Sequence, residues 1–164
     1  MNLKLNTVFA IFLITLSSGI YGQQNTMAEY EFEVNSEVSA NLPGEVYYDN
    51  NEDADFETLY NDDFELDLTC YKGNNFEYFS DLNEFINEIA EGYEFKNFSD
   101  YIKIDIKPGV KGQYSLTYDK EEECNIIFGV IQDSFSRKLY EFTLYCYNIN
   151  SETAAQIING IKIN

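Results

Sequence analysis

The chain of 164 residues contains no histidine, no tryptophan, two prolines and three cysteines. Without an imidazole, a Ser–His–Asp or Cys–His catalytic site cannot form, and zinc ligated by histidine is excluded. The sequence also has no P-loop, no dinucleotide-binding glycine fingerprint and no G-x-S-x-G or S-x-x-K motif. We therefore expect a protein that is not an enzyme, with the reservation that carboxylate-pair glycosidases carry no sequence motif.

Basic residues are few: ten Lys and Arg against 29 Asp and Glu give a formal net charge of −19. Residues 29–94 hold 20 of the acidic residues and one base, whereas residues 95–164 hold nine acidic residues and eight bases. Contacts with phosphates need Lys or Arg, so we expect neither nucleic acid nor an anionic membrane surface as a partner. The acidic half is either a surface for a basic partner or a solvated surface that favours solubility.

Long apolar runs are limited to the N-terminus. Lys4 precedes nine apolar or nearly apolar residues at 8–16, and small residues follow up to Gly22. This order is typical of a secretory signal peptide. The apolar run is too short for a membrane-spanning helix, which needs about 20 residues. We predict that residues 1–22 are a signal peptide and that the mature protein is exported, to a periplasm or to the medium.

Hydrophobic periodicity predicts an α+β fold. Residues 23–29 are expected to be a flexible N-terminus, residues 30–34 a possible strand and residues 41–61 an acidic loop. Apolar residues alternate with polar ones, as in half-buried strands, at 64–70, 102–106, 114–118, 124–130 and 140–146.

Two segments have helical periodicity instead. Apolar residues from Leu82 to Tyr93 recur at the spacing of one helix face, after Ser80 and Asp81, either of which can cap the helix. A second helix is expected to begin with Ser151 as its cap. The order of elements predicts a single domain over residues 30–164, an antiparallel meander with helices packed on it.

The last two predicted strands suggest a register and a disulfide. A turn centred on Phe135 places apolar residues opposite each other and sets Cys124 opposite Cys146. Opposed residues in antiparallel strands have Cα atoms about 4.5–5.5 Å apart, a separation that a disulfide accepts. Cys124 and Cys146 are therefore candidates for a bridge. The alternatives are a bridge through Cys70, or three buried thiols.

The acidic loop contains the candidate metal ligands. Oxygen-bearing side chains recur there at every second position: Asp49, Asn51, Asp53, Asp55 and Glu57. Such spacing is found in calcium-binding loops. Ala54 stands where an EF-hand has its glycine, and Tyr60 stands where it has its bidentate acid. The segment is either a calcium site or a solvated loop, and no other cofactor is expected.

Two sequence likenesses complete the analysis. The segments FELDLTCY (64–71) and YEFTLYCY (140–147) are alike, through duplication or through common strand composition. The C-terminal YEFTLYCYNINSETAAQIINGIKIN, with LPGEV at residues 42–46, resembles PsbP-like proteins in its layout. That resemblance implies an antiparallel sheet with helices on both faces, and an accessory protein rather than an enzyme.

Together these features favour an exported, non-enzymatic accessory protein that binds another protein through an acidic surface. The partner would have a basic surface. One alternative is a module that binds calcium, or a small molecule in a pocket lined by Tyr114, Tyr118 and Tyr140. Another is an inhibitor or immunity protein that neutralises a basic toxin outside the cytoplasm.

Overall fold

A computed structural model describes residues 29–33, 38–51, 56–72, 78–107 and 109–163. The predicted α+β class is confirmed, because these residues form antiparallel sheets with helices packed on them. The chain divides into two compact units, where the sequence analysis expected one domain. In the described part of the chain, neither helix has the length and apolar character needed to cross a membrane.

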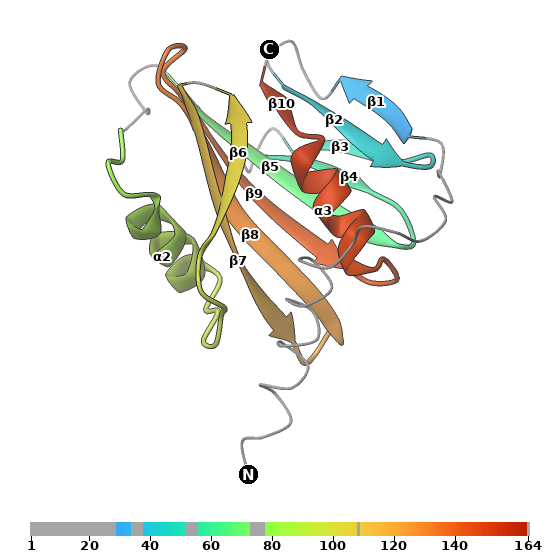
Figure 1. Ribbon diagram of the computed structural model, residues 1–164. Helices are drawn as coiled ribbons and strands as arrows, with labels where there is room; N and C mark the ends of the chain where they lie inside the picture. Colours follow the sequence, from blue (N-terminus) through green and yellow to red (C-terminus); the bar gives the residue numbers. More distant parts are fainter. Residues whose placement is uncertain (1–28, 34–37, 52–55, 73–77, 108, 164) are drawn as a thin grey trace, which may run out of the picture. The chain divides into compact units, whose positions relative to one another are not determined.

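The unit of residues 46–148 is a seven-stranded antiparallel sheet with one helix (Figure 1). Its strands lie in the order β3-β4-β5-β9-β8-β7-β6. Their bounds are β3 Tyr47–Asn51, β4 Phe56–Tyr60, β5 Phe64–Lys72, β6 Ile102–Lys107, β7 Val110–Asp119, β8 Cys124–Asp133 and β9 Lys138–Cys146. The four strands from β6 to β9 are the predicted meander, and β5 pairs with the last of them.

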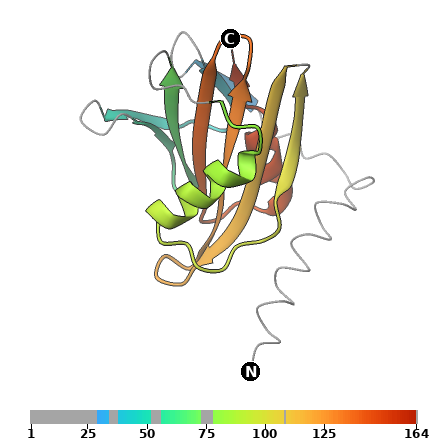
Figure 2. The ribbon, with the colours of Figure 1, turned by 90° about the vertical axis from the view of Figure 1, so that its left-hand side faces the viewer.

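Helix α2, Leu82–Gly92, packs on one face of this sheet, in front of the strands in Figure 2. Its N-cap is Asp81, one of the two predicted caps. The Asp81 carboxylate accepts a hydrogen bond from the Asn83 N–H at 3.0 Å. The apolar residues at helical spacing include Ile86, which is fully buried. They pack on a core that β8 supplies with alternate residues such as Phe128. Burial of these apolar side chains is what holds the helix on the sheet.

The β8–β9 hairpin has a register one residue away from the predicted one. The connecting turn contains four residues, 134–137, between the paired Asp133 and Lys138. The Asp133 carboxylate accepts hydrogen bonds from the N–H groups of Phe135 at 2.8 Å and Ser136 at 3.3 Å. The length of this turn sets the register of both strands. The apolar pattern does not determine this register, because β8 is buried on both faces.

The predicted acidic loop at residues 41–61 is mostly strand, so that prediction was wrong. Its first residues end β2, and β3 and β4 form a hairpin that extends the sheet beyond β5. Leu59 is fully buried and anchors β4. Acidic and amide side chains obscured the strand signal, because backbone pairing with β5 allows an edge hairpin to carry polar residues.

The second unit combines the two ends of the chain. Strand β2, Val38–Pro43, lies between β1, Glu29–Glu33, and the C-terminal β10, Lys162–Ile163. The β1 strand agrees with the prediction for residues 30–34. Helix α3, Ser151–Asn159, contacts β2. Its N-cap is Asn150, one residue before the predicted cap, and the Asn150 side chain accepts from the Thr153 N–H at 2.9 Å.

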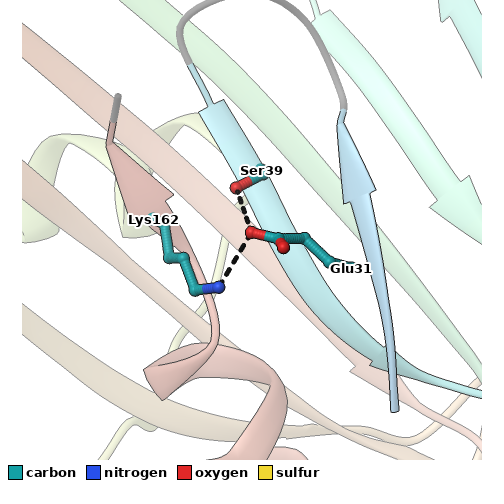
Figure 3. A network of polar contacts seen from close by, with 3 residues as sticks. All are labelled: Glu31, Ser39 and Lys162. Carbon is teal, nitrogen blue, oxygen red and sulfur yellow. Dashed lines mark hydrogen bonds and ion pairs between the residues drawn. The ribbon is translucent and has the colours of Figure 1, made fainter.

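A small polar network connects the three strands of this unit (Figure 3). The Glu31 carboxylate accepts from Lys162 Nζ at 2.8 Å and from the Ser39 hydroxyl at 3.5 Å. The bond to Lys162 and its positive charge hold the pKa of Glu31 below its usual value. Both charged side chains are exposed, so water screens the pair and its contribution to stability is small.

Candidate functional site

The sheet face that carries α2 changes character from one strand to the next. On β8 it is apolar and buried against α2. In the cross-strand register, the same face continues on β9 and β5 with polar residues: Glu141, Thr143 and Tyr145, then Glu65, Asp67 and Thr69. Helix α2 packs mainly over β8 and β7, which leaves these polar positions beside the helix. We call them the acidic face.

Three carboxyl groups lie on the acidic face, with Asp67 between the other two in the strand register, and we call them the carboxylate cluster: Glu65, Asp67 and Glu141. Asp67 pairs with Thr143, so Glu141 is its diagonal neighbour on the adjacent strand. Side-chain hydroxyls donate hydrogen bonds to two of the three carboxyl groups. Thr58 donates to Asp67 Oδ1 at 2.6 Å, and the Tyr71 hydroxyl donates to Glu141 Oε2 at 2.8 Å.

Burial raises the pKa of every member of the carboxylate cluster. For Asp67 the effect of burial exceeds that of the Thr58 hydrogen bond, which acts in the opposite direction. Burial also raises the pKa of Glu141, with a further contribution from the charge of Asp67. The pKa of Glu65 is raised by burial and then by the neighbouring carboxylates. Each ionised group is therefore less stable here than in water.

The charge of this cluster is not compensated within the described residues. No Lys or Arg of the described chain forms an ion pair with any of the three carboxylates. Carboxylates that are partly removed from water and lack a cation cost free energy in the folded protein. A bound cation would offset that cost.

Three tyrosines surround the carboxylate cluster: Tyr71, Tyr93 and Tyr145. Burial raises the pKa of all three phenols, and the negative charges of the cluster add to the effect. The phenols therefore stay protonated at neutral pH and can donate hydrogen bonds. Their rings are supported from α2 and the segment after it, since Tyr71 packs edge-on against Phe85 and Tyr93 stacks on Phe95.

Thr143, at the centre of the acidic face, has an unsatisfied hydroxyl. Its side chain is 1% exposed, and its Oγ1 is the one buried side-chain oxygen or nitrogen of the described residues without a hydrogen-bond partner. The phenol of Tyr93 is its neighbour, and an interaction between the two hydroxyls opposes the rise in the pKa of Tyr93, although the pair does not reach hydrogen-bond geometry. An unsatisfied buried hydroxyl is unfavourable in a folded protein.

Exposed aromatic rings border the acidic face on its β3–β4 side. Tyr47 is opposite Tyr60, and Tyr60 is opposite Glu65. The two rings lie 5.6 Å apart, and 68% of Tyr47 and 39% of Tyr60 is exposed. Exposed tyrosines beside carboxylates are a common composition for a surface that binds another protein.

The predicted calcium ligands do not coincide with this cluster. Asp49 is opposite Thr58, whereas Glu57 is opposite Asn50, so Asp49 and Glu57 occupy opposite faces of the β3–β4 hairpin. Asp53, Asp55 and the side chain of Asn51 lie outside the described residues. Within the described residues, no three His, Cys, Asp or Glu side chains are grouped to hold a metal. Calcium binding remains a prediction.

The predicted Cys124–Cys146 disulfide is absent. Cys146 is opposite Asn125 and not Cys124, and none of the three cysteines is in a disulfide. Burial raises the pKa of Cys146 to about 12, so this thiol is unreactive at neutral pH. The tyrosines of the predicted pocket, Tyr114, Tyr118 and Tyr140, lie on one face of the sheet and differ in burial. Tyr140 is fully buried, whereas 39% of Tyr118 is exposed.

Sequence analysis identified the polar positions of β5 and β9 only as solvent-facing residues. One feature of the sequence relates these two strands. The two alike segments of the sequence, residues 64–71 and 140–147, are these neighbouring strands. Periodicity alone does not show which strands pair, so Glu141 could not be assigned to the same site as Asp67.

Comparison with known proteins identifies the fold. No protein-family model and no curated protein sequence matches the chain. The crystal structure of the Saccharomyces cerevisiae Ran-binding protein Mog1p matches with a TM-score of 0.56 and 8% identity, over 84% of this chain and 96% of that one. A mutant form of Mog1 matches over the same shares of both chains, with a TM-score of 0.51 and 8% identity.

A structure from Bacteroides thetaiotaomicron also matches, with a TM-score of 0.51 and 14% identity, over 85% of this chain. The chain spans only 49% of that protein. At these identities the likenesses show a shared fold and nothing further about activity.

Proposed function

We propose that this chain is an exported, non-enzymatic accessory protein that binds another protein through the acidic face. The observation that carries the proposal is the carboxylate cluster, in which three partly buried carboxyl groups have no cation among the described residues. The partner presents a basic surface to Glu65, Asp67 and Glu141. Its positive charges supply the counter-charge that the described residues do not provide.

The carboxylate cluster has a free-energy cost that a partner can offset. Removing carboxylates from water without a partner is unfavourable, and a stable fold does not require it. Charge complementarity across an interface offsets this cost, accelerates association and selects the partner. The exposed pair Tyr47 and Tyr60 adds apolar contact area at the border of the same surface.

Two further observations support the proposal. Mog1p, whose fold this chain shares, is described as a Ran-binding protein, so the fold is compatible with binding to another protein. Export is supported by the signal-peptide pattern of residues 1–22. The absence of histidine and of catalytic motifs from the sequence supports a role without catalysis.

The test is affinity capture by the tagged mature chain, residues 23–164, from envelope and medium fractions. Asp67→Asn/Glu141→Gln is the site variant, and Asp100→Asn/Glu88→Gln is the matched control, since both control residues are exposed. We expect one basic protein that binds the wild type and the control. Its dissociation constant should rise at least about tenfold for the site variant, which corresponds to about 1.4 kcal/mol.

Salt provides the second arm of this test. Ionic contacts at a partly exposed surface weaken as ionic strength rises, so high salt should release the partner from the wild type. Equal capture by the site variant and the control would refute the acidic face as the binding surface. If the captured protein is a toxin or hydrolase that the chain inhibits, the function is that of an inhibitor or immunity protein.

A further inference from the structure

We infer, building on the proposed function, that the acidic face is a receptor for one arginine side chain of the partner, whose guanidinium bridges Asp67 and Glu141. Such a receptor is a specific binding site for one partner side chain within the acidic face. It depends on which oxygens in the site already have hydrogen-bond donors and which do not.

Each of the two carboxylates has one oxygen held by a hydroxyl and one oxygen without a side-chain donor. Thr58 donates to Oδ1 of Asp67, and Tyr71 donates to Oε2 of Glu141. These bonds orient both groups. Oδ2 of Asp67 and Oε1 of Glu141 therefore remain as oriented acceptors on neighbouring strands.

The separation of the two groups favours a planar, branched cation. Glu141 is the diagonal neighbour of Asp67 across β5 and β9, and diagonal neighbours have Cα atoms roughly 7–8 Å apart. A guanidinium presents five donors in one plane and can bind a carboxylate on each side. An ammonium is a compact point charge that is more strongly hydrated, so it bridges two separated carboxylates less well.

Thr143 provides the independent indication that a ligand belongs here. Its buried hydroxyl has no hydrogen-bond partner and lies between Glu141 and Tyr145 along β9, opposite Asp67. A guanidinium N–H between the two carboxylates would give this oxygen a donor. The phenol of Tyr93 lies near Thr143, and Tyr93 is 44% exposed, so a guanidinium that reaches the Thr143 hydroxyl must displace this phenol.

The aromatic rings suit the same ligand. Tyr71, Tyr93 and Tyr145 surround the cluster, and their phenols interact electrostatically with its carboxylates. An arginine plane stacks on aromatic faces and is attracted by the ring electrons. Hydroxyls, carboxylates and rings together match the three kinds of contact that a guanidinium makes.

The experiment is an NMR titration of the mature chain with N-acetyl-arginine amide, at constant ionic strength. N-acetyl-lysine amide and N-acetyl-citrulline amide are the comparison ligands. Citrulline has nearly the shape of arginine but lacks its charge. We expect arginine to shift the amide signals of β5 and β9 near the cluster, with an affinity at least fivefold higher than that of lysine. Citrulline should give no saturable shift.

Two variants locate the binding site. Asp67→Asn/Glu141→Gln should abolish the arginine shifts, and the Asp100→Asn/Glu88→Gln control should retain them. Thr143→Val, which keeps the side-chain shape, should weaken arginine binding at least threefold while the folded spectrum persists. That spectrum distinguishes a lost contact from a lost fold.

Several results would overturn the inference. Lysine binding as tightly as arginine would refute the preference for a guanidinium. Shifts that are absent, that spread evenly over the surface, or that survive in the site variant would refute the site itself. Arginine binding without a captured protein would contradict the proposed function and leave this receptor site standing. A captured basic partner without arginine binding would refute the receptor site and leave the proposed function standing.

Discussion

Removing the charge of Asp67 should stabilise the folded protein. In Asp67→Asn, the amide oxygen can still accept the hydrogen bond from Thr58, so the main loss is the negative charge. Asp67 and Glu141 are diagonal neighbours, whose Cα atoms lie roughly 7–8 Å apart, and two charges at a separation of that order repel each other by about 0.5–2 kcal/mol for effective dielectric constants between about 80 and 20. We expect the free energy of unfolding to rise by about that amount at neutral pH.

The gain should depend on pH in a defined direction. Burial raises the pKa of Asp67 in the folded state, so the folded state binds more protons than the unfolded state between the two pKa values. Stability of the wild type therefore falls as pH rises through this range. The difference between variant and wild type should be near zero at about pH 3, below the usual carboxyl pKa. The stability difference should reach its full value once the pH exceeds the raised pKa of Asp67.

Urea denaturation at both pH values is the assay, with Asp100→Asn as the control. Guanidinium chloride is unsuitable because the guanidinium ion resembles the proposed ligand. Asp100 is exposed, so its substitution should change stability by less than about 0.5 kcal/mol. A destabilised Asp67→Asn protein at neutral pH, or a gain that is equal at both pH values, would refute the assigned electrostatic environment.

Three further predictions concern the scaffold of the site. Gly129→Ala should destabilise the fold by about 1–3 kcal/mol or more, because a Cβ there would clash with the Gln113 carbonyl oxygen. Gly92→Ala, whose Cβ would meet nothing within 4 Å, is the control in the same urea assay. Ile86→Ala should cost about 2–5 kcal/mol by leaving a cavity under α2, and unchanged stability would contradict the packing. Alkylation of the unfolded, unreduced protein should label three thiols by mass spectrometry, and one labelled thiol would instead reveal a disulfide.

The elements of this fold were predictable where one face of each element is clearly apolar. The stretch from Phe64 to Cys70 alternates cleanly and is β5, and the stripe that contains Ile86 is α2. The β3–β4 hairpin was missed because its side chains are largely acidic, aromatic or amide, and backbone pairing at a sheet edge tolerates them. The local hydrophobic pattern of a strand indicates which of its side chains are buried. It does not indicate with which other strand it pairs.

The site was less predictable than the fold because its parts are distant in sequence. Tyr71 and Glu141 are 70 residues apart and form one hydrogen bond. The register error also had a physical cause: β8 is buried on both faces, so the apolar pattern fits either of two registers. The alike residues 64–71 and 140–147 lie on neighbouring strands with the same alternation, so the two segments share an environment.

Chemical footprinting of carboxyl groups tests the central claim most directly. The protein would be labelled with a carbodiimide and an amine, alone and in complex with its captured partner, and the modified residues quantified by mass spectrometry. The account predicts that the partner protects Glu65, Asp67 and Glu141, while exposed Asp100 and Glu88 label equally in both samples. Equal labelling of the carboxylate cluster with and without the partner, or protection confined to other carboxylates, would contradict the acidic face as the binding site.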